Sequence, residues 1–371
     1  MKKLTLRRYK WLKKRQLRMA RKKAPRFVFI VGRSGVGQGK AVRKDVMPRV
    51  LCFDRNCSNT LSVLSKIRRS LQGVSKLSRK IRERKLKRRG GVTGYWPFET
   101  VKYIGISSAL VLAAEYERWH TITNTNMIVI DPHKWHPSVF ICLREMGFFD
   151  NFKLPLGKPI ISSSEDLRII RMKSGSTADP VAVAGLISEL KSMNLSESDN
   201  FKDGMIPLYG AMIEGIMNVV RHAYPKDIEL GFENIGKWWM TGAVSQSMRR
   251  MSVAIFDQGV TIPRSLPAWD KYSLWKENMK RRIGMAPAAN DRNFDGIAIW
   301  AAVEESVSST GDLHRGLGLA QMRSFIDGCS SGYLRIISRN GEVTFRPGDV
   351  PVAMNYDHSL DGTLIEWSVG F

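Results

Sequence analysis

Residues 208–225 read LYGAMIEGIMNVVRHAYP, and this stretch decides how the carboxy-terminal half of the chain is interpreted. Its apolar residues recur at the spacing of one helix face. On another face Glu214, Asn218 and His222 follow one another at intervals of four residues, so their side chains line up along the helix. A carboxylate that can accept a proton lies one turn from an amide oxygen that can bind a cation. The pattern predicts a polar site on this helix.

Three glycine-containing motifs follow this helix along the chain. The tripeptide DQG at 257–259 ends a strand-like run, the hexapeptide HRGLGL at 314–319 opens another helix, and the tripeptide DGT at 361–363 precedes a final strand. An aspartate after a buried strand offers its carboxylate to a polar ligand, and a glycine lets the ligand lie against the backbone. Glycines at a helix start expose backbone N–H groups, where the helix dipole favours phosphate.

The order of these four motifs resembles the N, G1, G2 and G3 boxes of the GHKL family, whose ATP-binding domain has the Bergerat fold. That family includes histidine kinases, gyrase, mismatch-repair ATPases, heat-shock chaperones and anti-sigma-factor serine kinases. The string around Glu214 and Asn218 is most similar to that of the anti-sigma-factor kinases. The resemblance implies an α/β sandwich over residues 181–371 that binds ATP and Mg²⁺. No phosphoacceptor-histidine helix is apparent, which disfavours a two-component kinase.

The resemblance implies a role for each motif. Glu214 is the expected catalytic base, Asn218 the expected Mg²⁺ ligand, and Asp257 the expected partner of the adenine amino group. His222 either contacts the phosphates or makes an ordinary helix contact. The residues that the resemblance implies for nucleotide binding are Asn218, His222, Asp257, Gly259, Arg315, Gly316, Gly318 and Thr363.

Two further features belong to the same comparison. The chain departs from the family pattern at Thr261, where a second glycine is common in the G1 box. Residues 264–312, rich in Trp, Lys and Asn, fall where the family places a mobile lid over the nucleotide. Such a lid is expected to become ordered when nucleotide binds.

Strand and helix patterns alternate over residues 48–156, which predicts an α/β domain. The segments YIGISSALVLAA at 103–114 and PSVFICLREMGFF at 137–149 resemble the STAS domain of bacterial anti-sigma-factor antagonists. In that family a serine in the turn after the strand can be phosphorylated, which corresponds here to Ser107 or Ser108. The alternative is that both serines cap a helix. The polar residues 157–180 are expected to be a linker to the ATP-binding domain.

The formal net charge of +25 comes from the front of the 371-residue chain. Residues 1–90 contain 31 Lys and Arg against 3 Asp and Glu, whereas residues 91–371 contain 28 against 31. Dense positive charge neutralises phosphates, and aromatic rings stack on exposed bases. Residues 1–47 are therefore expected to be a basic arm with a glycine-rich linker that binds RNA or DNA. A solvated tail or contact with an acidic membrane surface is the alternative. The residues expected to contact nucleic acid are Lys2, Lys3, Arg7, Arg8, Lys10, Trp11, Lys13, Lys14, Arg15, Arg18, Arg21, Lys22, Lys23, Arg84, Lys85, Lys87, Arg88 and Arg89.

The rest of the composition bears on the cellular compartment of the protein. The four cysteines show no metal-ligand spacing, no apolar run reaches the roughly 20 residues that span a bilayer, and no apolar signal core follows the basic start. A cytoplasmic protein without a transmembrane segment is expected. The interpretation leaves three functions. The first is an ATPase, or ATP-gated switch, that acts on a nucleic acid or protein partner. The second is a serine kinase acting on a STAS-like domain, and the third is a non-catalytic ATP-sensing scaffold in a bacterial defence or retroelement complex. Each is compatible with a homodimer.

Overall fold

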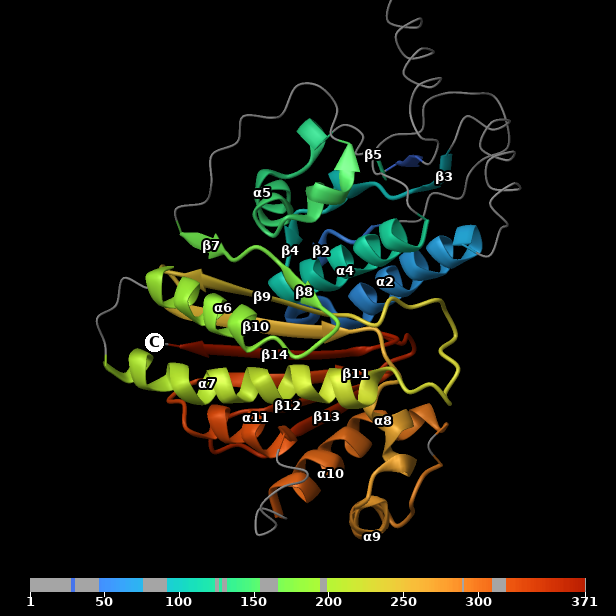
Figure 1. Ribbon diagram of the computed structural model, residues 1–371, viewed down its shortest axis with the longest axis vertical. Helices are drawn as coiled ribbons and strands as arrows, with labels where there is room; N and C mark the ends of the chain where they lie inside the picture. Colours follow the sequence, from blue (N-terminus) through green and yellow to red (C-terminus); the bar gives the residue numbers. More distant parts are fainter. Residues whose placement is uncertain are drawn as a thin grey trace, which may run out of the picture.

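The computed structural model describes residues 28–30, 47–75, 92–123, 127–128, 132–153, 166–193, 199–288, 290–308 and 318–370. All residues expected to contact nucleic acid lie outside this part of the chain, as do Arg315 and Gly316. The described residues form a mixed α/β fold organised around one large antiparallel sheet (Figure 1). The fold class expected from the sequence is therefore confirmed.

The central sheet has eight strands in the order β13-β12-β11-β14-β10-β9-β7, and β8 also pairs with β9. Its strands are β7 (Leu167–Ile169), β8 (Lys173–Gly175), β9 (Trp238–Ser245), β10 (Arg250–Asp257), β11 (Gly332–Ser338), β12 (Gly341–Phe345), β13 (Val352–Asn355) and β14 (Thr363–Gly370). The last strand, β14, lies between β10 and β11, which places Thr363 opposite Asp257. Strands β7 and β8 lie within residues 157–180, which were expected to be a linker.

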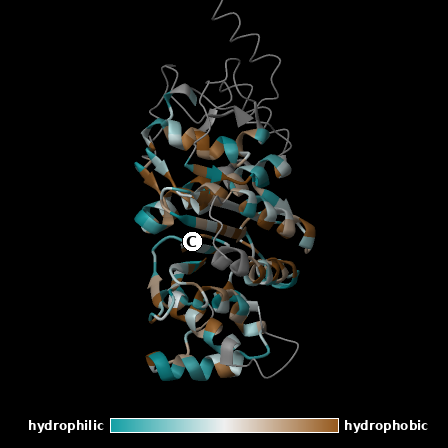
Figure 2. Ribbon diagram, turned by 90° about the vertical axis from the view of Figure 1, so that its left-hand side faces the viewer, coloured by the Kyte–Doolittle hydropathy of each residue, from teal (hydrophilic) through white to brown (hydrophobic). Residues whose placement is uncertain are grey.

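Four helices cover one face of this sheet, namely α6 (Pro180–Met193), α7 (Asp199–Asn218), α10 (Asp295–Ser308) and α11 (Gly318–Asp327). Because side chains alternate along a strand, Val253 and Ile255 of β10 enter the core beneath these helices, while Ala254 and Phe256 enter the core on the other side. Figure 2 shows hydrophobic residues along the strands and helices where these layers meet. Helix α7 continues into a π-helical turn, η4 (Val219–Ala223).

The described residues between 47 and 153 cover the second face of the sheet. Helices α2 (Phe53–Ser75) and α4 (Ile106–Thr123) pack together, and α4 lies against β9 and β10. Leu61 and Leu112 share one hydrophobic core with Trp239 and Phe256 of the sheet. We call this part the N-terminal layer. Its other elements are β2 (Val50–Leu51), β3 (Val92–Tyr95), η1 (Phe98–Thr100), β4 (Tyr103–Ile104), β5 (Met127–Ile128), η2 (Pro132–Lys134), α5 (Pro137–Glu145), η3 (Phe148–Asn151) and β6 (Phe152–Lys153), with β1 (Val28–Ile30) paired to β3.

The segment expected to be a flexible lid is helical in its described part. It consists of α8 (Ile262–Ser265), η5 (Leu266–Ala268), α9 (Tyr272–Ile283), η6 (Arg292–Phe294) and α10. Leu266, Trp275 and Met279 form a small core of their own with alanines of α10. The segment therefore already has hydrophobic packing that would hold its shape.

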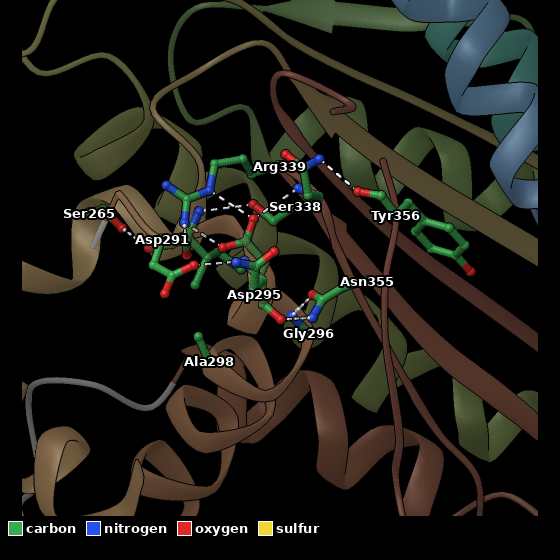
Figure 3. Close-up of polar contacts among 12 residues, drawn as sticks. Ser265, Asp291, Asp295, Gly296, Ala298, Ser338, Arg339, Asn355 and Tyr356 are labelled. Atoms are coloured by element: carbon green, nitrogen blue, oxygen red, sulfur yellow. Dashed lines mark hydrogen bonds and ion pairs between the residues drawn. The ribbon is translucent and has the colours of Figure 1, made fainter. Parts of the chain in front are cut away.

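Polar contacts anchor the base of this segment to the sheet (Figure 3). Arg339 in the β11–β12 turn pairs with Asp295 at the start of α10, and Asn340 donates its backbone N–H to the same carboxylate at 3.0 Å. The Gly296 N–H donates to Oδ1 of Asn355 at 2.8 Å. These contacts fix the start of α10 to the sheet. Among the helices of the described residues, none is both long and apolar enough to cross a membrane.

Candidate functional site

The clearest sign of a site is the approach of Gly318 to the polar face of α7. A Cβ at Gly318 would lie 3.0 Å from Nδ2 and 3.2 Å from Oδ1 of Asn218, and 3.1 Å from Oε2 of Glu214. Helix α11 begins at Gly318, so its first N–H groups have no partner within the helix. The structure thus brings Glu214 and Asn218 of α7 against the start of α11.

The turn after β10 rests on η4, directly after the C-terminal end of the same helix. A Cβ at Gly259 would lie 2.3 Å from the carbonyl oxygen of Ala223, so no other residue fits there without backbone movement. The Val260 N–H donates to that carbonyl at 2.7 Å. The DQG turn is therefore fixed to η4, and π-helical turns of this kind often occur at functional sites.

Asp257, the last residue of β10, is a buried carboxyl group with a perturbed pKa. It is 5% exposed, and its Oδ1 accepts the Gly259 N–H at 2.7 Å. Burial raises the pKa of Asp257 to about 7, against the opposing effects of backbone hydrogen bonds from Gly259 and Thr363 and of the Arg68 charge. A ligand that donates a hydrogen bond to the ionised form of such a buried carboxyl stabilises that form, and the group can ionise near neutral pH.

Thr363 lies beside Asp257 because the two residues pair across β10 and β14. Its hydroxyl is 2.9 Å from the Ser338 hydroxyl, whose oxygen also accepts the Ile262 N–H at 2.9 Å. The backbone of Thr363 thus supports Asp257, while its side chain ties β14 to β11 and to the start of the lid segment. The expectation that Thr363 takes part in nucleotide binding stays a prediction.

Thr261 adopts the backbone conformation that the family pattern assigns to glycine. Its φ of 78° and ψ of 148° lie in a region that residues with a Cβ rarely enter, and Thr is branched at that atom. Its hydroxyl is buried without a hydrogen-bond partner. The turn is therefore held in its shape by its surroundings against local strain.

His222 lies in η4, where its side chain is exposed. Partial desolvation of the ring and the charge of Arg221 lower the pKa of His222. Described contacts do not tie its ring to Glu214 or Asp257. The imidazole is therefore neutral at physiological pH, which leaves it a hydrogen-bonding group more than a charge for phosphate.

The described residues contain no group of three or more His, Cys, Asp or Glu side chains arranged to hold a metal ion. Mg²⁺ does not require one, since it commonly binds through one or two protein oxygens together with phosphate oxygens. Glu214 Oε2 and Asn218 Oδ1 both border Gly318 and are ligands of the type that Mg²⁺ prefers. The residues present fit a magnesium–phosphate group.

The two serines considered for phosphorylation are inaccessible. Ser107 and Ser108 are 3% and 2% exposed in the first turn of α4, after its first residue, Ile106. The Ser107 side chain hydrogen-bonds to the buried Glu366 of β14. Neither hydroxyl can be reached by a phosphate donor in this state of the protein.

A group of buried charges behind the DQG turn was not anticipated. Arg68 of α2 and Glu115 and Arg118 of α4 are at most 3% exposed, and both arginines form ion pairs with Glu115. The one sequence signal is a Glu and an Arg three residues apart in α4. Nothing local indicates that Arg68 would be their partner.

No protein-family model, curated protein or solved structure matches this chain. The interpretation of the site therefore rests on its residues and their geometry.

Proposed function

We propose that the protein binds Mg·ATP along α7 and hydrolyses it as an ATP-gated switch of the GHKL type, with its basic N-terminal segment holding a nucleic acid or a nucleoprotein partner. The observation that carries the proposal is the contact of Gly318 with Glu214 and Asn218. The DQG turn rests on the end of the same helix. The described residues of these motifs, Asn218, Gly259 and Gly318 among them, therefore lie near the C-terminal end of α7, which supports the proposal.

The arrangement separates a base-binding end from a phosphate-binding end. At the first, the ionised carboxylate of Asp257 accepts a hydrogen bond from the exocyclic amino group of adenine, and the absence of a side chain at Gly259 leaves backbone for the base to rest on. At the second, the free N–H groups at the start of α11 receive the phosphates. Asn218 would hold Mg²⁺, which supplies neutralising charge to the phosphates.

Glu214 is one turn before Asn218 and faces the same glycine. From there its carboxylate orients a water molecule towards the terminal phosphate and accepts a proton as the water attacks. General-base assistance of this kind accounts for about 10²- to 10⁴-fold in rate. The net charge of the first 90 residues suits delivery of this activity to a polyanion.

Substitution of Glu214 tests the proposal. Glu214→Gln keeps the shape of the side chain and removes its basicity, so hydrolysis should fall at least 100-fold while equilibrium binding of a fluorescent ATP analogue changes little. Glu189→Gln on α6 is the matched control, because Glu189 makes only a surface ion pair with Lys173.

Each outcome of this experiment has a meaning. Hydrolysis that survives Glu214→Gln would exclude Glu214 as the base. Binding without turnover by the unmodified protein would favour the ATP-sensing scaffold. Transfer of labelled phosphate to a protein would favour the serine kinase. Absence of ATP binding by the unmodified protein would overturn the proposal as a whole.

A further inference from the structure

The residue after Asp257 links the site to the N-terminal layer. Strand alternation turns Asp257 towards the helices and Gln258 towards the opposite face. Nε2 of Gln258 donates to Oε1 of Glu115 at 2.9 Å, and both side chains are at most 1% exposed. The middle residue of the DQG motif is therefore bonded to α4.

Arg68 connects the same carboxylate to the DGT motif. Its guanidinium pairs with Glu115 and donates to the backbone carbonyl of Asp361, and its Nη1 lies 3.7 Å from Oδ2 of Asp361. Arg118 completes the group by pairing with Oε2 of Glu115 at 3.0 Å and donating to the carbonyl of Glu233 at 2.7 Å. One buried cluster therefore bonds both turns that flank the candidate adenine site.

Such a cluster is poor evidence for stability. Two arginines and one glutamate lose their hydration on burial, and an apolar group of the same volume often stabilises a fold equally well. Burial opposes ionisation of Glu115, yet Arg68 and Arg118 hold its pKa below the usual value, so the cluster is fully charged. Directional hydrogen bonds between charged groups instead define one relative position for the elements that carry them.

We infer that Gln258 and Arg68 are positioning residues, through which α2 and α4 set the orientation of the Asp257 carboxylate and thereby the selectivity of the site for adenine over guanine nucleotides. The inference rests on the proposed function. Adenine presents an amino group to Asp257, whereas guanine presents a carbonyl oxygen at the same place. Selectivity therefore depends on the direction of that carboxylate, while the phosphate end of the site is indifferent to it.

The test compares the affinity of the full-length protein for ATP and for GTP in three variants. Gln258→Leu removes the hydrogen bond to Glu115 and should weaken ATP binding about tenfold, the equivalent of about 1.4 kcal/mol, with GTP affinity little changed. Arg68→Lys keeps the charge but cannot bond Glu115 and Asp361 together, and should lower the ATP:GTP ratio similarly. Gln246→Leu is the control, because Gln246 makes a 2.7 Å hydrogen bond to Met193 at the other end of β10.

A charge exchange provides the rescue. Gln258→Glu alone sets two carboxylates against each other, so ATP affinity should fall as the pH rises. The double variant Gln258→Glu/Glu115→Gln restores one amide and one carboxylate and should return the ATP:GTP ratio to within about threefold of the original.

An ATP:GTP ratio that is unchanged in Gln258→Leu overturns the inference, and so do equal losses of both affinities in parallel with a lower unfolding midpoint, since that pattern indicates a purely structural role. Either result leaves the proposed function intact if the unmodified protein still binds and hydrolyses ATP. A protein that binds neither nucleotide overturns both.

Discussion

Replacement of Asp257 by asparagine should stabilise the protein at neutral and alkaline pH while removing nucleotide binding. Burial raises the pKa of Asp257 from 3.8 to about 7. Between these values the folded state holds a proton that the unfolded state has lost, so the free energy of unfolding falls as the pH rises through this window. Each unit of pKa corresponds to about 1.36 kcal/mol, which gives a loss on the order of 4 kcal/mol by pH 8.

Asparagine keeps the shape of the neutral carboxyl and does not ionise. Its amide oxygen can still accept the Gly259 N–H that Asp257 Oδ1 accepts at 2.7 Å. The gap between the two proteins should therefore be small near pH 4 and grow to several kcal/mol by pH 8. Nucleotide affinity should respond in the opposite sense. In the unmodified protein it rises through pH 7 as the carboxylate forms, and in Asp257→Asn it stays weak at every pH.

The assay is urea unfolding followed by tryptophan fluorescence at pH 5, 6, 7 and 8 without nucleotide, with titration of a fluorescent ATP analogue at the same pH values. Asp179→Asn controls for the loss of one acidic residue, since Asp179 is only half-buried at the start of α6, where its Oδ1 accepts the Ala182 N–H. Parallel pH profiles for the unmodified protein and Asp257→Asn would refute the reasoning, because Asp257 would then titrate normally.

Three further results are expected. Gly318→Ala puts a methyl group 3.0–3.2 Å from polar atoms of Asn218 and Glu214, so equilibrium binding of ATP should weaken at least tenfold with the fold retained; unchanged affinity would contradict the site. Thr261→Gly removes the Cβ at φ 78° and should raise the free energy of unfolding by about 1 kcal/mol, with the extra chain entropy of glycine already included. Urea unfolding measures this change, and a less stable variant would argue against strain at that turn. Deletion of residues 1–26 should flatten the salt dependence of oligonucleotide binding, since each lost phosphate contact removes about 0.7–0.9 from the slope of log K against log salt. An unaltered slope would place the contacts elsewhere.

Sequence patterns predicted the helices and strands that have a motif or a periodicity of their own. Helix α11 begins at Gly318, inside the HRGLGL motif expected to open a helix, and β14 begins at Thr363, inside the DGT motif expected to precede a strand. Helix α7, predicted to follow Pro207, instead runs through it from Asp199, because a proline in an exposed turn costs only part of the helix hydrogen bonding. Strands β7 and β8 are three residues each and were missed, since so short a segment carries no periodicity that could separate it from a loop.

Gly318 and Asn218, which lie in two different sequence motifs, meet in the structure. The spacing of motifs along the sequence gives no information about the residues that pack behind them. No sequence motif marks the residues behind Gln258. In the sequence nothing distinguishes Glu115, which bonds Gln258, or Arg68, which pairs with Glu115, from other charged residues. Tertiary packing alone determines which charged residues meet behind Gln258, and patterns in a single sequence do not encode it.

The two-sided sheet gives the DQG turn its significance. Asp257 and Gln258 are adjacent in the chain, but Asp257 faces the helices and Gln258 faces the N-terminal layer. A displacement of the N-terminal layer at Gln258 would therefore also move Asp257. Helix α2 carries Arg68 and ends at Ser75, and the basic run of residues 78–89 follows directly in the sequence. A polyanion that shifted α2 would therefore alter nucleotide affinity by some factor, and thermodynamic linkage requires the nucleotide to alter polyanion affinity by the same factor. In the proposed switch the signal enters beside the base, so the helical face proposed to bind the phosphates need not move.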